Sequence, residues 1–212
     1  MCGRYVLFTA PEQLIPAIRS ATGSSNVQVV GGMVASKNYN IAPTHVVPIV
    51  RNFRGAPTLG PATWGYPPKT VFNARGETAM HKPMFQGSDT CLFVMDGWYE
   101  WNAGDDGKKQ PWFTHREDGK PILVAGLCKN FEGKVHATMV TTAATGDMEW
   151  LHHRMPRVLV GDEASTWLEG GEVAEMITHP AQDSWPELRS HKVGREVGSV
   201  RHNNAGLIEP VG

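Results

Sequence analysis

The second residue of the chain, Cys2, carries the clearest potential for chemistry. Its side chain is small enough for the initiator Met1 to be removed, which would leave a free α-amine beside the thiol. These groups titrate near ~8 and ~8.5, so both are nucleophilic near neutral pH with modest help. Together they can attack an aldehyde twice, first forming an imine and then closing a five-membered ring. The alternative is that Cys2 is only a small residue at the start of a strand.

A polar segment further along the chain holds Asn73, Arg75 and Glu77. Asn73 and Arg75 alternate with apolar residues in Phe72-Asn73-Ala74-Arg75, so an extended chain presents the amide and the guanidinium on one side. The donor geometry of a guanidinium matches phosphate oxygens, which favours a phosphate contact for Arg75. Alternatively, Asn73 caps a turn and Arg75 forms a salt bridge with Glu77.

Glu100 lies among aromatic residues in Trp98-Tyr99-Glu100-Trp101, directly after an apolar run. A carboxylate in an aromatic and partly dry setting tends to have a raised pKa, which suits acid–base chemistry. The alternative is a surface glutamate that alternates with inward-facing aromatic residues along a strand.

The adjacent residues His152 and His153 supply candidate proton donors or acceptors, because the free pKa of histidine lies nearest neutrality. For either one, a hydrogen-bonded structural role is the alternative. A zinc site needs further ligands, and the sequence has no CxxC or HExxH motif. We therefore expect no metal site.

Most of the chain reads as short strands joined by tight turns that contain Gly, Asn or Asp. The continuous apolar run Cys91-Leu92-Phe93-Val94-Met95 predicts a strand buried on both faces. The strand–helix rhythm of a parallel sheet is absent, so an antiparallel meander is expected. The other predicted strands are Arg4–Phe8, His45–Val50, Thr58–Tyr66, Pro111–Arg116, Pro121–Cys128, Val135–Thr142 and Arg157–Val160.

Short helices accompany the predicted strands. Thr9 and Glu12 have the spacing of a capping box, and the helix that follows is expected to stop near Gly23. Asp162 is predicted to cap a second helix, and a third short helix is expected near Val173–Ile177.

The chain is expected to fold as one α+β domain over residues 1–212, with a central antiparallel, barrel-like sheet and flanking short helices. The tail from Lys192 to Val211 is predicted to be extended and to pack back on the sheet. With 41% hydrophobic and 19% charged residues, the composition is that of a soluble globular protein. No apolar run approaches the roughly 20 residues of a membrane helix, and no secretion signal is visible. Three separated cysteines fit a reducing compartment, so we expect a cytoplasmic protein. We also expect a monomer with no membrane partner.

The net charge of −1 argues against a protein whose whole surface grips nucleic acid. A local basic groove is compatible with this net charge, because the electrostatic potential depends on where the charges lie. Tryptophans can stack on unpaired bases, although such residues more often fill a core. The candidates are Trp64, Trp98, Trp101 and Trp112.

Several short segments, taken in order, form a specific pattern over nearly the whole chain. They are Met1–Tyr5, Tyr39–Pro43, Trp64-Gly65, Asn73–Arg75 with Glu77-Thr78, Asp96–Trp101, Lys109–Pro111, Thr141–Ala144, His152 with Arg154 and Pro156, Val197–Val200 and Leu207–Pro210. This pattern resembles the SRAP family (SOS response-associated peptidase), the abasic-site processing proteins that cross-link to single-stranded DNA. The chain departs from the family in lacking a second tryptophan after Trp64 and an arginine after Thr78.

The resemblance implies that Cys2 traps the ring-opened aldehyde of an abasic site as a thiazolidine, which protects the lesion during the DNA damage response. It implies that Asn73 positions the reacting group, that Glu100 manages protons, and that His152 helps to open the sugar ring. It implies no cofactor. The partner is single-stranded DNA with an abasic site, and a bacterial protein of this kind would associate with the nucleoid. The implied DNA contacts are Arg4, Asn40, Trp64, Arg75, Lys82, Thr142 and Arg154.

Three other functions fit parts of the sequence. Met-Cys-Gly also opens N-terminal-nucleophile amidotransferases, but their further Asn-Gly and Gly-Asp signatures are missing. A peptidase that cleaves its own N-terminal extension is a second idea, although ordinary methionine removal suffices to expose Cys2. A non-catalytic reader of single-stranded DNA, using tryptophan and arginine residues without bond formation, is the third.

Overall fold

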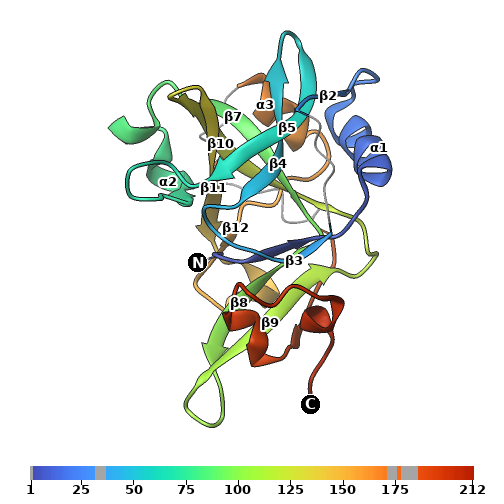
Figure 1. Ribbon diagram of the computed structural model, residues 1–212, viewed down its shortest axis with the longest axis vertical. Helices are drawn as coiled ribbons and strands as arrows, with labels where there is room; N and C mark the ends of the chain where they lie inside the picture. The colour runs from blue at the N-terminus through green and yellow to red at the C-terminus, as the bar shows by residue number, and fades with distance from the viewer. Residues whose placement is uncertain (1, 32–36, 171–175, 178–185) are drawn as a thin grey trace.

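The computed structural model describes residues 2–31, 37–170, 176–177 and 186–212. The fold is mixed α+β and dominated by strands, with a ring of strands above a second, smaller sheet in the view of Figure 1. Within the described ranges the helices are α1 (Pro11–Thr22), α2 (Gly76–Ala79) and α3 (Glu163–Glu169), with 3₁₀ helices at Pro83–Phe85, Gly146–Met148, Arg195–Gly198 and Ala205–Ile208.

The larger sheet closes on itself as a ring. Its antiparallel ladder runs through β5 (Ala56–Trp64), β4 (Val46–Phe53), β7 (Asp89–Met95), β10 (Ile122–Phe131) and β11 (Lys134–Ala143). The ring closes where β11 runs parallel to β5, with Ala137 opposite Trp64. The predicted barrel-like sheet is confirmed, but its closure by a parallel pair makes it a ring and not a strict barrel. β2 (Gln28–Val29), β6 (Asn73–Arg75) and β12 (Arg154–Pro156) pair along its edges.

β7 is buried from Cys91 to Met95, as the apolar run predicts. Its two edges pair with β4 and β10, so the strand lies inside the sheet. The helix α3 packs against it, and the Trp167 indole N–H donates to the carbonyls of Cys91 at 2.9 Å and Gly126 at 3.1 Å. Because both faces of the strand are buried, apolar residues do not alternate with polar ones along it.

The second sheet has the strand order β13–β9–β8–β1–β3. Its strands are β1 (Tyr5–Leu7), β3 (Asn38–Ile41), β8 (Gly97–Ala103), β9 (Lys109–Arg116) and β13 (Leu188–Lys192). Only Asp96 separates the end of β7 from the start of β8, so the chain passes directly from one sheet to the other. In Figure 1, β1 crosses the middle of the view between the ring and the β8–β9 hairpin.

Asp96 is the link that ties β1 to this junction. Its carboxylate accepts hydrogen bonds from the main-chain N–H of Thr9 at 2.8 Å and from the Thr9 hydroxyl. The prediction that Thr9 caps α1 is therefore wrong, because Ala10 is the N-cap and no side chain caps the helix. The predicted stop is confirmed, since Gly23 ends α1 in the left-handed conformation with φ of 63°.

Two other sequence predictions change near the C-terminal half. The predicted strand Arg157–Val160 is wrong, because the pairing with β11 is made by Arg154–Pro156 and residue 158 forms only an isolated bridge. α3 does follow Asp162, but the aspartate side chain makes no capping hydrogen bond. The helix predicted near Val173–Ile177 falls largely outside the described residues.

The tail does pack against the second sheet, but it is not extended throughout. After β13 it forms the two 3₁₀ helices at Arg195–Gly198 and Ala205–Ile208, seen in red beside the β8–β9 hairpin in Figure 1. They close a small second core against the sheet, made of Val6, Tyr99, Phe113, Val193, Val197 and Leu207.

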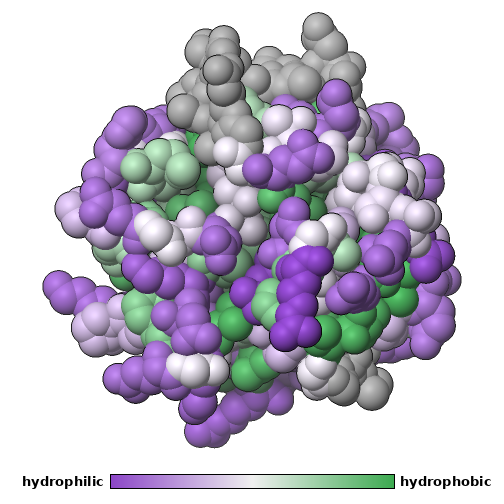
Figure 2. Space-filling model, turned by 90° about the horizontal axis from the view of Figure 1, so that it is seen from above, coloured by the Kyte–Doolittle hydropathy of each residue, from purple (hydrophilic) through white to green (hydrophobic). Residues whose placement is uncertain are grey.

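The face seen from above in Figure 2 is mostly hydrophilic, with apolar side chains showing between the polar ones. None of the helices in the described part of the chain is long and apolar enough to cross a membrane.

Candidate active site

Four segments that are far apart in the sequence bring the predicted reactive residues to one region. Cys2 directly precedes β1, and Asn73 begins β6, which lies parallel to β11 with Asn73 opposite Met139. Glu100 lies in β8, which pairs with β1 through Tyr5 opposite Trp98. His152 stands just before β12. The ring and the second sheet each contribute part of this site.

Cys2 is fully buried at the N-terminal side of β1. Its carbonyl accepts a hydrogen bond of 2.8 Å from the Asn73 side-chain amide, and its Sγ lies 3.7 Å from the carbonyl oxygen of Arg4. Burial raises the pKa of the Cys2 thiol far above its ordinary value, and the charge of Glu100 raises it further. The thiol is therefore protonated at neutral pH.

Glu100 is 5% exposed, so the alternative of a surface glutamate is wrong. Along β8 its side chain shares a face with Trp98, which is buried, while Tyr99 and Trp101 point to the opposite face. Its charge acts on both the Cys2 thiol and the His152 imidazole. A buried carboxylate is therefore within electrostatic reach of two groups that can exchange protons.

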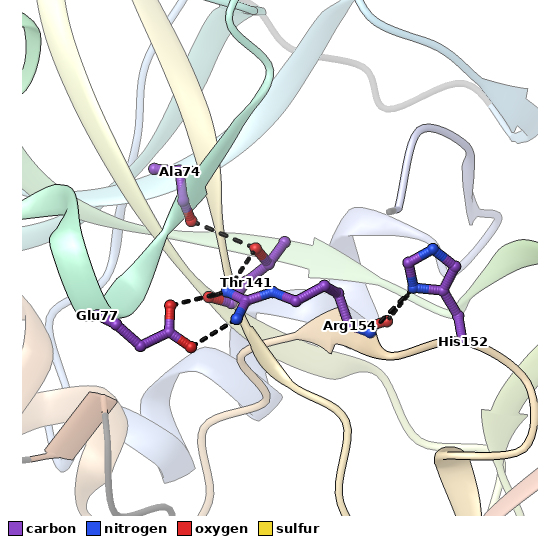
Figure 3. Close-up of polar contacts among 5 residues, drawn as sticks. All are labelled: Ala74, Glu77, Thr141, His152 and Arg154. Atoms are coloured by element: carbon purple, nitrogen blue, oxygen red, sulfur yellow. Dashed lines mark hydrogen bonds and ion pairs between the residues drawn. The ribbon is translucent and has the colours of Figure 1, made fainter.

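His152 is held by the main chain of the strand that follows it. Its Nδ1 lies 2.9 Å from the main-chain nitrogen of Arg154 and 3.1 Å from the Arg154 carbonyl oxygen (Figure 3). Its ring stacks on His153, with the ring centres 4.2 Å apart. Burial lowers the pKa of His152, and the charge of Glu100 opposes that shift.

The Arg154 side chain turns away from His152 and toward α2, as Figure 3 shows. Its guanidinium donates to both carboxylate oxygens of Glu77, at 2.5 and 2.9 Å, and to the carbonyl of Thr141 at 2.7 Å. The side chain is only 10% exposed. Glu77 thus pairs with Arg154 and not with Arg75, whose side chain is exposed. Arg154 holds β12, and through it His152, against β11 and α2.

Arg4 and Asn40 fasten the C-terminal segment to the strands beside Cys2. The Arg4 guanidinium donates to the Asn40 side chain at 2.7 Å and to the carbonyl of Val197 at 2.6 Å. Asn40 is buried, and its amide donates to the carbonyls of Ser199 and His202, each at 2.9 Å. The side chains of Arg4 and Asn40, both predicted to contact DNA, therefore form hydrogen bonds within the protein.

The other residues predicted to contact DNA fall into two groups. Trp64 is fully buried, and its indole N–H donates to the carbonyl of Phe72 at 2.9 Å, so it has no exposed face for a base. Thr142 is buried as well. Arg75 and Lys82 are exposed near α2, where a phosphate can reach them.

A pocket of about 430 Å³ opens beside the predicted reactive residues. Glu100 and His152 lie in its wall together with Trp101, Lys109 and Gly198. Lys109 was not among the predicted site residues, and its place in the short Lys109–Pro111 motif was the only signal for it. A larger hollow of about 820 Å³ lies between α1 and the loop before β10, away from these residues. No cluster of three or more potential metal ligands occurs in the part of the chain that the structure describes.

Comparisons with known proteins identify the family of the chain. The family model described as SOS response associated peptidase (SRAP) matches residues 1–200, and the chain belongs to this family. A relative named abasic site processing protein YedK, from Escherichia coli (strain K12), is 37% identical over 194 residues, which cover 82% of this chain and 84% of the relative. The abasic site processing protein YoqW of Bacillus subtilis (strain 168) is 26% identical over 230 residues, covering 99% of each chain.

Two solved structures share the fold. A protein from Bacteroides thetaiotaomicron has a TM-score of 0.78 at 18% identity, with 99% of this chain and 100% of that chain covered. A protein from Bordetella bronchiseptica has a TM-score of 0.66 at 22% identity, with 91% and 100% covered. At these identities the likeness concerns the fold alone.

Proposed function

We propose that this protein processes abasic sites in single-stranded DNA by forming a covalent cross-link through Cys2. One observation carries the proposal: Glu100 and His152 border the same pocket, and the charge of Glu100 acts on the buried Cys2 thiol. Membership of the SRAP family and the names of the relatives support abasic DNA as the substrate. The proposal requires Cys2 to be the first residue of the mature chain, because only then is its amine free.

The raised thiol pKa sets the order of the two bond-forming steps. The thiol stays protonated, so the α-amine attacks the aldehyde carbon of the ring-opened abasic site first. A C–N bond forms and the carbonyl oxygen leaves as water, which gives an imine. The Cys2 sulfur then adds to the imine carbon as the C=N electron pair moves to nitrogen, and the thiol proton ends on that nitrogen. The thiazolidine forms with loss of one water and no change in oxidation state.

The neighbouring side chains supply what each step needs. The Glu100 carboxylate accepts the thiol proton and returns it to the ring nitrogen. The imidazolium form of His152 donates a proton to the sugar ring oxygen as the bond from C1 to that oxygen breaks, and the C1 hydroxyl gives its proton to solvent, which leaves the aldehyde. Asn73 fixes the position of Cys2 by holding its carbonyl. The exposed side chains of Arg75 and Lys82 are the candidates for flanking phosphates, and so few cations predict weak, salt-sensitive DNA binding.

The test is a denaturing gel of the protein incubated with a single-stranded oligonucleotide that bears one abasic site. A band that survives denaturation, with an intact mass equal to protein without Met1 plus DNA less one water, is expected. Cys2→Ala abolishes the stable adduct, and Cys2→Ser leaves at most a weaker one. Cys128→Ala, at another buried cysteine in β10, is the matched control and retains the adduct.

Two results would overturn the proposal. Binding without any covalent band, although mass spectrometry shows Cys2 at the N-terminus, would indicate a non-catalytic DNA reader. Release of ammonia from glutamine by the same preparation would indicate an amidotransferase. A variant in which removal of Met1 is blocked is expected to behave as Cys2→Ala does.

A further inference from the structure

A tryptophan pair lies on the surface next to the candidate active site. Trp150 is 49% exposed, which is unusual for so large an apolar side chain, and it comes two residues before His152. Its ring meets the edge of Trp112 in β9, with the ring centres 4.7 Å apart and the planes at 77°. The Asn102 side chain donates to the Trp150 carbonyl at 2.9 Å and so anchors this segment to β8.

The register of the second sheet makes this pair continuous with the candidate active site. Trp112 is directly opposite Glu100 in the β8–β9 ladder and directly opposite Lys192 in the β9–β13 ladder. Residues opposite each other in an antiparallel pair point to the same face. Glu100, Trp112 and Lys192 therefore form one row across three neighbouring strands, and the row begins at the residue proposed to handle protons.

A positive charge lies at the far end of this row. The Lys192 ammonium is 5.8 Å from the centre of the Trp112 ring. It is also 3.8 Å from the Asp105 carboxylate, but that side chain is fully exposed, so the ion pair is weak and exchangeable. Two aromatic rings beside a weakly paired cation are the combination with which proteins hold a base and its phosphate.

We propose that Trp150, Trp112 and Lys192, here called the tryptophan platform, bind one unpaired nucleotide of the DNA strand that carries the lesion. The base stacks on the exposed Trp150 ring, and its phosphate lies near Lys192. The proposal rests on the proposed function for its ligand, because the row from Glu100 leads a strand held at the active site onto the platform. Stacking of this kind is tolerant of sequence, so no base preference is expected.

The test measures equilibrium binding of labelled single-stranded oligonucleotides without an abasic aldehyde, so that no cross-link contributes. Each oligonucleotide has one nucleotide, at a different position, replaced by a base-free tetrahydrofuran. In wild type, removal of the base at one flanking position weakens binding by at least about fivefold, the lower end of the contribution of one stacked base. In Trp150→Ala, binding of the intact oligonucleotide weakens by a similar factor and the effect of removing that base disappears.

Controls separate the platform from the reacting site. Trp150→Tyr restores most of the binding, and Lys192→Gln lowers the salt dependence of log K by about 0.7. Val29→Ala, at an exposed apolar residue on β2, leaves binding unchanged. Cys2→Ala loses the cross-link yet keeps the platform effect, whereas Trp150→Ala still cross-links at saturating abasic DNA. Two results overturn the proposal. One is that removing a base at any position leaves the affinity of the wild-type protein unchanged. The other is that Trp150→Ala binds the intact oligonucleotide as tightly as wild type does.

Discussion

Replacing Glu77 by alanine is expected to lower the free energy of unfolding by about 2 kcal/mol, because Arg154 loses the counter-charge on which it depends. Removing one partner of a fully buried ion pair costs about 3–5 kcal/mol. Here the Arg154 side chain is 10% exposed and that of Glu77 is 37% exposed, so water screens part of the interaction. The Thr141 carbonyl also keeps its 2.7 Å hydrogen bond to the guanidinium. For both reasons, the expected loss of stability is smaller than the roughly 3–5 kcal/mol of a fully buried pair.

Arg154→Met is expected to cost about 2–3 kcal/mol, because it removes the same pair and also leaves the Thr141 carbonyl without this donor. The double variant Glu77→Ala with Arg154→Met is then no less stable than Arg154→Met alone. The coupling energy, measured from urea unfolding followed by circular dichroism, is expected to be about 2 kcal/mol. If the two single losses add to within about 0.5 kcal/mol, the two side chains do not act as a pair and the reasoning fails.

The pH dependence of the same pair provides an independent check. The hydrogen bonds from Arg154 hold the pKa of Glu77 below its usual range. A carboxyl with a lowered folded pKa contributes stability that is present above its unfolded pKa of ~4.3 and is lost as the pH falls through the folded pKa. The stability difference between wild type and Glu77→Ala is therefore expected to be full at pH 7 and to shrink in acid. A difference that stays constant from neutral to strongly acidic pH would contradict this cause.

Three further predictions follow from other contacts. The His152 ring titrates below its ordinary pKa of 6.5, and Glu100→Gln lowers that pKa further, because it removes the charge that favours the imidazolium; an NMR titration checks both. Asn40→Ala costs about 1–3 kcal/mol in urea unfolding, because it leaves carbonyls of the C-terminal segment without donors. Gly97→Ala lowers the melting temperature more than Gly198→Ala does, because a Cβ at Gly97 would collide with the Thr114 carbonyl oxygen whereas one at Gly198 meets nothing within 4 Å; thermal unfolding of the two variants measures the difference.

Local pattern was enough to predict most of the elements. The apolar run before Asp96, and the turns between the strands after it, depend on neighbouring residues only, so they can be recognised without knowing what packs on them. The burial of Glu100 also agrees with its aromatic neighbours. The positions of Cys2 and Asn73 in one site were expected from the resemblance alone, since nothing local relates residues so far apart.

The tertiary structure decided which partner each polar or aromatic side chain takes. Thr9 had the spacing of a helix cap, but it bonds to Asp96, 87 residues away, because β1 lies against the β7–β8 junction. Glu77 had Arg75 as a near neighbour, yet it pairs with Arg154, which β12 brings beside α2. Periodicity predicts which face of an element a side chain occupies, but it carries no information about what the fold places opposite that face.

The exposure of the tryptophans was also decided by the tertiary structure. Sequence alone favoured Trp64 as a stacking residue and did not point to Trp150, but the closing of the ring buries Trp64, whereas Trp150 stays half exposed beside the site. Cys2 follows the same rule. The sequence by itself placed a cysteine directly after the initiator methionine, because that depends only on residue type and position. Only the tertiary structure buried the thiol near the charge of Glu100, and this desolvation raises the pKa of the thiol.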